Sequence, residues 1–122
     1  MKLHLARSDN QNTFTGYGEG YVMVNAMRHE SSLVVLPDRP VESWPVSGVD
    51  ALQEDDLQFL AGLGVEIVLL GTGQSLRFLP PRLLQPLAQA RVGVEVMDTR
   101  AACRTYNILV AEGRKVAAAL IL

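Results

Sequence analysis

The chain has 122 residues, enough for one domain with a buried core. Its hydrophobic share of 48% and charged share of 20% are ordinary for a globular protein and exclude a disordered chain. Eleven basic and thirteen acidic side chains give a net charge of −2 and are scattered along the chain, which argues against a nucleic-acid-binding surface.

Membrane-spanning and secreted classes are also disfavoured. No stretch approaches the roughly twenty apolar residues of a membrane span, and residues 1–10 lack the apolar block of a secretory signal. The single cysteine, Cys103, cannot form an internal disulfide and has no zinc-ligand spacing, which suits a reducing compartment. We therefore expect a single cytoplasmic domain over residues 1–122.

The amino-terminal part contains short runs rich in tyrosine, valine and methionine at residues 14–17, 21–24 and 32–36. Runs of this length and composition favour strands over helices. We expect an antiparallel meander with turns at Glu19-Gly20 and Asn25-Ala26, the second less favourable because alanine tolerates a positive φ poorly. The meander either extends the main sheet or forms a second, smaller one.

Residues 37–50 contain three of the six prolines and are expected to run over the surface as a connection. Trp44, the only tryptophan, lies within this segment. The favoured interpretation is a lid that buries its large ring over the core, and the alternative is a ring that stacks on a ligand.

Helices and strands alternate in the rest of the chain. We expect helices at residues 54–61, from Pro80-Pro81 onward with Pro86 in the first turns or at a kink, and from Asp98-Thr99 to a stop at Gly113. Strands are expected at residues 65–70, 92–97 and 116–122. This order requires right-handed crossovers, so the fold class is α/β: a compact three-layer domain with a mixed, largely parallel sheet between helices.

The glycine turn Gly71-Thr72-Gly73 follows one predicted strand, and Asp98-Thr99 follow the next. If these strands are parallel neighbours, both segments emerge at one edge of the sheet, where open α/β folds place ligands. The dinucleotide-binding fingerprint fits only in part, because Leu76 replaces a small residue and no helix opens at the glycines. Asp98 is interpreted first as a helix cap and second as a ribose-binding acid.

Polar residues of the last helix are the other candidates for a site. Asn107 interrupts a helix interior, so its amide either ties the helix to the Gly71–Gly73 loop or faces a ligand there. Arg100 and Arg104 lie one turn apart and are solvated unless an anion or a carboxylate lies between them. Arg114 can pair with Glu112 or Asp98, and the sequence does not choose.

Other chemistry has less support. His4 and His29 have no partner at metal-ligand spacing, and no serine has a nucleophile-elbow motif, so neither a metal, a cofactor nor a catalytic residue is predicted. Cys103 is interpreted as a small buried residue rather than a nucleophile.

A set of segments taken together is typical of one protein family: Tyr17-Gly18, 24–25, 33–37, Trp44, Gly71-Thr72-Gly73, 94–99, Ala101-Ala102, Thr105-Tyr106-Asn107 and Glu112-Gly113-Arg114. In these segments the chain resembles the small family that includes mitochondrial NADH dehydrogenase (complex I) assembly factor 3 and uncharacterised bacterial and archaeal proteins. Ala26 departs from the glycine expected after Asn25. The resemblance implies a three-layer α/β fold, a non-catalytic part in assembling a respiratory complex in mitochondria, and no catalytic residues.

Two hypotheses follow from the sequence. In the first, the protein is a non-enzymatic interaction or assembly module, a monomer or a homodimer, with other proteins as partners. In the second, it binds or converts a small anionic metabolite or nucleotide at the sheet edge. The residues of this edge would be Gly71, Thr72, Gly73, Asp98, Thr99, Asn107 and Arg114. The second hypothesis loses its basis if side chains fill the sheet edge and Asp98 and Asn107 are both satisfied by backbone groups.

Overall fold

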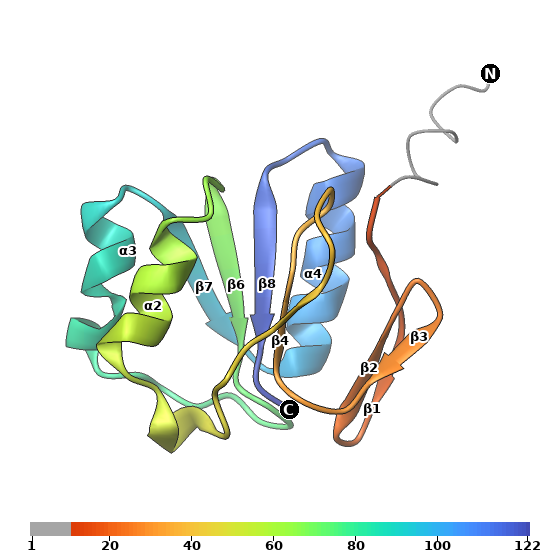
Figure 1. Cartoon of the computed structure of the whole chain (residues 1–122), viewed down its shortest axis with the longest axis horizontal. Helices are drawn as coiled ribbons and strands as arrows, with labels where there is room; N and C mark the ends of the chain where they lie inside the picture. The colour runs from red at the N-terminus through yellow and green to blue at the C-terminus, as the bar shows by residue number, and fades with distance from the viewer. Residues whose placement is uncertain (1–10) are drawn as a thin grey trace.

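A computed structural model describes residues 11–122, and its strands form two separate sheets (Figure 1). The smaller sheet is an antiparallel meander of β1 (Phe14–Gly18), β2 (Tyr21–Val24) and β3 (Met27–His29). The larger sheet has the order β5-β4-β8-β6-β7. The bounds of its strands are β4 (Leu33–Val35), β5 (Glu42–Ser43), β6 (Ile67–Gly71), β7 (Gly93–Met97) and β8 (Val116–Leu120).

The helices cover both faces of the larger sheet. They are α2 (Glu54–Ala61), α3 (Gln85–Gln89) and α4 (Thr99–Ala111), with 3-10 helices η1 (Val49–Ala51) and η2 (Pro81–Leu84) in the connections. The helices α2 and α3 lie together on one side of the sheet, and α4 lies on the other side beside the smaller sheet (Figure 1). The expected three-layer α/β architecture is confirmed.

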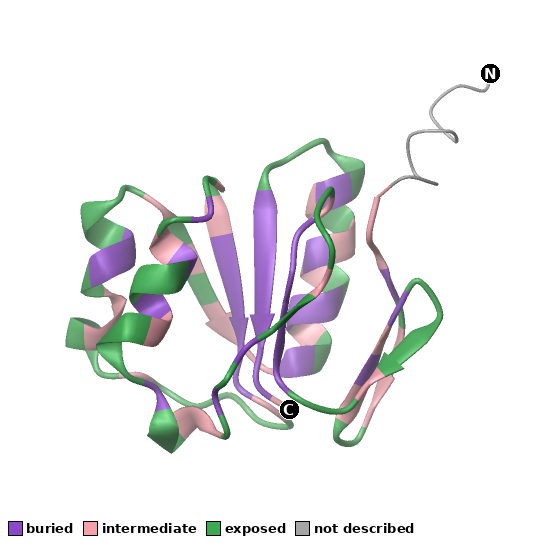
Figure 2. Cartoon of the chain, viewed as in Figure 1, coloured by how far each residue is buried: buried purple, intermediate pink, exposed green. Residues whose placement is uncertain are grey.

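Two apolar cores fill the space between these layers, and alternate residues of the sheet strands contribute to each. The first core joins α2, α3 and the 36–52 segment to one face of the sheet, through residues such as Val68, Leu70 and Ala119. The second joins α4 and the small sheet to the other face, through Leu69 and Ala118. Figure 2 shows β4, β6 and β8 as the buried centre of the molecule.

Parallel and antiparallel pairing are combined in the larger sheet. The strand β6 lies between β7 and β8 and is parallel to both. The strand β4 is antiparallel to β8 and to β5. The carboxyl ends of β6, β7 and β8 therefore meet at one edge, as the alternation of strands and helices predicts.

The third strand of the meander differs from the expected one. Residues 32–36 were expected in the meander, but β4 pairs with β8 in the main sheet, and β3 completes the meander instead. All three residues of β4 are buried, because the strand is covered on both faces. The residues of β3 are Met-Arg-His, which have no β-branched side chain to indicate a strand.

The turn between β2 and β3 requires a positive φ at Ala26, which is unfavourable for alanine. Asn25 and Ala26 have φ values of 52° and 67°, the left-handed pair of a tight hairpin turn. The side chain of Thr15 accepts a hydrogen bond from the Ala26 N–H at 2.8 Å, and Asn25 Oδ1 accepts one from Thr13 N–H at 3.1 Å. These contacts to β1 and to Thr13, which directly precedes it, compensate for the strain at alanine.

The helix boundaries are mostly those expected, with one exception. The helix at 54–61 is confirmed, and Gly113, with φ of 79°, follows the end of α4. The segment from Pro80 is not one helix but the 3-10 turn η2 followed by α3, and Pro86 lies in the first turn of α3. A proline is tolerated there because its missing N–H would have no partner within the helix.

The connection at residues 37–50 contains a short strand, which its prolines did not lead us to expect. Residues 42 and 43 form the short strand β5 against β4. Trp44 follows directly, is only 3% exposed and belongs to the first core, so its expected role as a lid is confirmed. His4, considered above for a metal site, lies outside the described residues.

Candidate functional site

The carboxyl edge of the parallel strands brings together the two segments that the sequence singled out. The N–H of Thr72 donates to the carbonyl of Met97 at 2.9 Å, and the N–H of Thr99 donates to the carbonyl of Gly73 at 2.8 Å. These backbone bonds link the loop after β6 to the start of α4. The two segments therefore form one hydrogen-bonded unit at this edge rather than two independent loops.

Gly71 lies within β6, at its last position, so the turn itself begins at Thr72. A Cβ atom at Gly71 would lie 2.8 Å from Leu120 Cδ2, 3.0 Å from Thr99 Oγ1 and 3.2 Å from Thr99 Cα. Glycine is needed here because α4 begins directly against the strand. This close approach explains Gly71 without a ligand.

Thr72 and Thr99 use their hydroxyl groups within the protein. Thr72 Oγ1 donates to the carbonyl of Ser75 at 2.7 Å and accepts from the N–H of Arg77 at 3.1 Å. Thr99 Oγ1 donates to the carbonyl of Ile121 at 3.2 Å and accepts from the N–H of Gly73 at 3.0 Å. Both residues are buried, so these hydroxyls close the loop.

Asp98 is the N-cap of α4, as the sequence predicted. Its Oδ1 accepts a hydrogen bond from the N–H of Ala101 at 2.9 Å. This contact satisfies one of the donors that the first turn of a helix leaves free, and the carboxylate also meets the positive end of the helix dipole. The interpretation of Asp98 as a cap therefore accounts for its position.

Asn107 forms a structural tie, but to a partner that the sequence did not indicate. Its Oδ1 accepts from the N–H of Phe14 at 2.9 Å, and its Nδ2 donates to the carbonyl of Phe14 at 2.8 Å. The loop at Gly71–Gly73 is out of reach because Asn107 lies eight residues after Thr99, about 12 Å along the helix at ~1.5 Å per residue. Asp98 and Asn107 thus both bond to backbone groups.

Arg114 lies at the opposite end of the sheet from the glycine turn. Its Nε lies 3.0 Å from Oε1 of Glu66, which directly precedes β6. Neither of the expected partners, Glu112 and Asp98, is the one observed. Asp98 is out of reach because α4 carries the chain from the carboxyl edge of the sheet back to the amino end of β6. Arg114 therefore leaves the candidate site.

A pocket of about 650 Å³ remains at the carboxyl edge. Of the predicted site residues, Gly73, Asp98 and Thr99 line it, whereas Gly71, Thr72, Asn107 and Arg114 do not. The other lining residues are Tyr17, Gly18, Glu19, Gly20, Gln74, Arg100, Arg104, Ile121 and Leu122. The pocket is therefore formed between the β1–β2 hairpin and the first turns of α4.

Arg100 and Arg104 also line the pocket, and the sequence suggested an anion between them without including them in the predicted site. Arg104 Nη1 donates to the Tyr17 hydroxyl at 3.1 Å, and this hydrogen bond raises the pKa of Arg104 above its ordinary value. Neither guanidinium is in a salt bridge with a carboxylate of residues 11–122. Their spacing of one helical turn was visible in the sequence, but the hairpin that completes the pocket was not.

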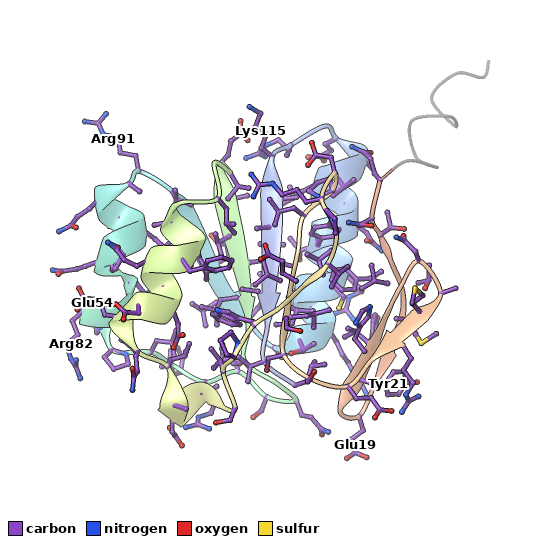
Figure 3. All side chains as sticks on the ribbon, viewed as in Figure 1. Glu19, Tyr21, Glu54, Arg82, Arg91 and Lys115 are labelled. Carbon is purple, nitrogen blue, oxygen red and sulfur yellow. The ribbon has the colours of Figure 1, made fainter. Side chains whose placement is uncertain are left out.

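Negative groups also line this pocket. Asp98 caps the helix, and Glu19, labelled at the tip of the β1–β2 hairpin in Figure 3, is the second acidic lining residue. The pocket therefore has mixed charge, with the two arginines on the α4 side. It can accept an anionic group only next to those arginines.

Cys103 is buried in the second core, and its burial raises the pKa of the thiol from 9.0 to about 12, although the nearby Arg104 acts in the opposite direction. Such a thiol stays protonated near neutral pH and is a poor nucleophile. Burial also raises the pKa of the Tyr106 hydroxyl. The expectation of a buried, unreactive Cys103 agrees with this environment.

The raised pKa of Cys103 predicts a stability loss at alkaline pH. The folded state keeps the thiol proton up to a pH of about 12, whereas the unfolded chain releases it near its ordinary pKa of 9.0. Stability should therefore fall as the pH rises from 9 towards 12. Urea unfolding at a series of pH values should show a shallower fall for Cys103→Ala than for the wild type. Equal slopes would contradict the prediction.

Within residues 11–122, no group of three or more histidine, cysteine, aspartate or glutamate side chains is placed to hold a metal ion. The same part of the chain has no helix with the length and apolar character needed to cross a bilayer.

The fold and the sheet edge define the chain as a three-layer α/β protein. The crystal structure of a Bordetella parapertussis protein is 47% identical and superimposes with a TM-score of 0.87, over 91% of this chain and 95% of that one. A solution structure from Bordetella pertussis, described as a Mth938-like domain, is 39% identical with a TM-score of 0.83 and covers 99% of this chain and 92% of that one.

The particular family follows from the match of residues 14–121. This chain belongs to the family described as protein of unknown function (DUF498/DUF598). Human NADH dehydrogenase [ubiquinone] 1 alpha subcomplex assembly factor 3 is 37% identical over 107 residues, which cover 86% of this chain and 58% of the human protein. The chain therefore spans little more than half of that relative. The family resemblance seen in the sequence is confirmed.

Proposed function

We propose that this protein is a non-enzymatic module that binds other proteins during the assembly of a respiratory NADH dehydrogenase, and that it acts in the cytoplasm. The observation that carries the proposal is the 37% identity to the human assembly factor across 86% of this chain. The chemistry of the described residues supports it. The buried polar residues Ser32, Thr72 and Thr99 all bond to backbone groups, and the Cys103 thiol is held protonated.

The test combines gene deletion with affinity capture in the organism that encodes the protein. Deletion should lower the amount of fully assembled NADH dehydrogenase on native gels, and the tagged chain should capture subunits or other assembly proteins of that complex. Normal levels of the assembled complex, together with a capture that contains none of its subunits, would refute the proposal.

The pocket at the carboxyl edge favours a second candidate function, the binding of a small anion. Arg100 and Arg104 project from successive turns of α4 into a cavity of about 650 Å³, and Gln74 adds an amide group. Two guanidinium groups one turn apart repel each other weakly, and an anion between them would relieve that repulsion. Asn107 lies outside this pocket, and Asp98 lines it with one carboxylate oxygen already bonded to the N–H of Ala101.

Replacement of both arginines by glutamine tests this second function. Inorganic phosphate and pyrophosphate, titrated into the ¹⁵N-labelled protein, should shift the amide signals of Gly73 and Arg100. The double variant Arg100→Gln/Arg104→Gln should bind at least about tenfold more weakly, since each charge-assisted hydrogen bond contributes about 1.5–3 kcal/mol. Arg82→Gln is the matched control, because Arg82 lines a different pocket. The second function is ruled out if neither anion shifts these signals.

A further inference from the structure

The two sheets have four edge strands, and three of these edges are closed or short. The strand β1 is the first. The side chain of Asn107 bonds both the N–H and the carbonyl of Phe14, and thus takes the place of a neighbouring strand. A bulge between Phe14 and Gly16 further disrupts this edge. Both devices are known ways to prevent unwanted strand pairing.

The edges β3 and β5 are protected by length and by their side chains. The strand β5 has two residues and lies between Pro40 and Pro45. The strand β3 has three, and Arg28 at its centre lies over the Tyr21 ring and pairs with Glu30. Short strands with proline or charge at an edge offer little to an incoming strand.

The remaining edge, β7, is neither short nor bulged, and Glu95 is its one charged residue. It extends over five residues without proline or lysine, and its register with β6 has no bulge. Figure 1 shows β7 as the outermost strand beside β6, and Figure 2 shows it in the colours of exposed and intermediate residues. Among the strands of residues 11–122, β7 is the one long edge that is left open.

The hydrogen bonds of β7 show which backbone groups are available. The N–H of Gly93 bonds to the Glu66 carbonyl, and the Met97 carbonyl accepts from the N–H of Thr72, so residues 93, 95 and 97 face β6. The backbone groups of the alternate residues Val94 and Val96 therefore point away from the sheet. On this side, α3 covers the edge only as far as Val92, whose N–H bonds to the Leu87 carbonyl at 2.9 Å.

The side chains of β7 give the edge its selectivity. Val94 and Val96 pack against the first core, on the side of α2 and α3. Glu95 must then point to the other face of the sheet, and it is exposed. The helix α4 on that face packs on β6 and β8, which leaves room above β7. Glu95 is the only charged residue of the strand.

We propose that β7 is a docking strand, to which an extended segment of a partner protein adds by main-chain hydrogen bonds to Val94 and Val96, with a lysine or arginine opposite Glu95. The proposal rests on the proposed function, because it takes a protein partner as the occupant. Antiparallel pairing of β7 with the β7 of a second copy, centred on Glu95, is disfavoured because two carboxylates would lie directly opposite each other. Strand addition at an open edge is a general mode of peptide recognition.

The test uses a synthetic probe and two variants of the whole chain. The probe is a peptide of about nine residues with alternating valine and threonine and a central lysine, a length that matches one strand. In ¹⁵N NMR, the probe should shift the amides of Val94 and Val96 and slow their hydrogen exchange. The same peptide with a central glutamate should bind about tenfold more weakly, because like charges directly opposite are unfavourable.

Val96→Pro removes the outward N–H and leaves the hydrogen bonds to β6 in place, because the N–H and carbonyl of Val96 point away from β6. It should abolish binding of the lysine probe. Glu95→Lys changes an exposed side chain only, so it keeps the fold and should reverse the preference between the two probes. Unchanged binding in both variants, shifts confined to other strands, or a dimer of the free chain paired through β7 would each overturn the proposal.

The outcome is separable from that of the proposed function. If tagged wild type and Val96→Pro capture the same NADH dehydrogenase subunits in cells, the docking strand is wrong and the assembly function stands. If the lysine probe binds β7 but deletion leaves the respiratory complex unchanged, the docking strand stands and the assembly function is wrong.

Discussion

Replacing Asn107 with leucine is expected to lower the free energy of unfolding by about 2–4 kcal/mol, although the side chain is nearly the same size. The N–H and carbonyl of Phe14 would both lose their partner, and an unsatisfied buried polar group costs about 1–3 kcal/mol. Phe14 is buried, and its ring packs edge-on against Tyr106 with 5.0 Å between the ring centroids. Water therefore cannot easily replace the amide.

Urea unfolding followed by the fluorescence of Trp44, the single and buried tryptophan, measures this loss. Asn107→Asp should lie between wild type and Asn107→Leu near neutral pH, since it keeps the acceptor for Phe14 N–H but loses the donor to its carbonyl. Thr105→Ala is the matched control on the same helix and is expected to change stability by less than about 0.5 kcal/mol. A leucine variant as stable as this control would show that the Phe14 contact contributes nothing.

The Asn107 contact also shows where sequence reasoning reaches its limit. A polar residue inside a helix signals a specific partner, and that much was predicted. The partner lies 93 residues earlier in the chain, on a strand of the other sheet. Helix periodicity gives the face on which Asn107 lies but carries no information on which distant element packs there. The kind of interaction was therefore predictable, and its partner was not.

Local signals predicted the elements that depend on local chemistry. Asp98 is the cap of α4 because carboxylates suit the free N–H groups of a first turn, and Gly113 follows α4 because glycine adopts a positive φ. Residues 33–35 were placed in the wrong sheet, because their three consecutive apolar side chains fit an edge strand of a meander or a buried strand equally well. Only the pairing with β8 distinguishes the two.

The candidate site was predicted in part for a similar reason. The parallel order of β6 and β7 places Gly73, Asp98 and Thr99 at one edge, and the pocket lies there. The other wall of this pocket is the β1–β2 hairpin, including Tyr17. No pattern within either segment indicates that the hairpin meets the start of α4, so Arg104 and its hydrogen bond to Tyr17 were not foreseen.

Gly71 in the glycine turn is there either because α4 packs closely against β6 or because a ligand approaches the backbone. The variant Gly71→Ala distinguishes these two explanations. We expect a loss of about 1–3 kcal/mol, the usual cost of overpacking a well-filled site. The added methyl group would lie 2.8 Å from Leu120 Cδ2 and 3.2 Å from Thr99 Cα. Thr99 cannot retreat freely, because its hydroxyl bonds to both Gly73 and Ile121.

Gly48→Ala is the matched control for Gly71→Ala. Gly48 has an extended backbone, with φ of −178°, and a Cβ atom there would meet nothing within 4 Å. This control should unfold within about 0.5 kcal/mol of the wild type. If Gly71→Ala matched it in stability, close packing of α4 against β6 would not explain the glycine, and a ligand that approaches the backbone at this edge would become the better explanation. A large loss in Gly71→Ala alone would instead place the origin of the motif in the packing of the sheet edge.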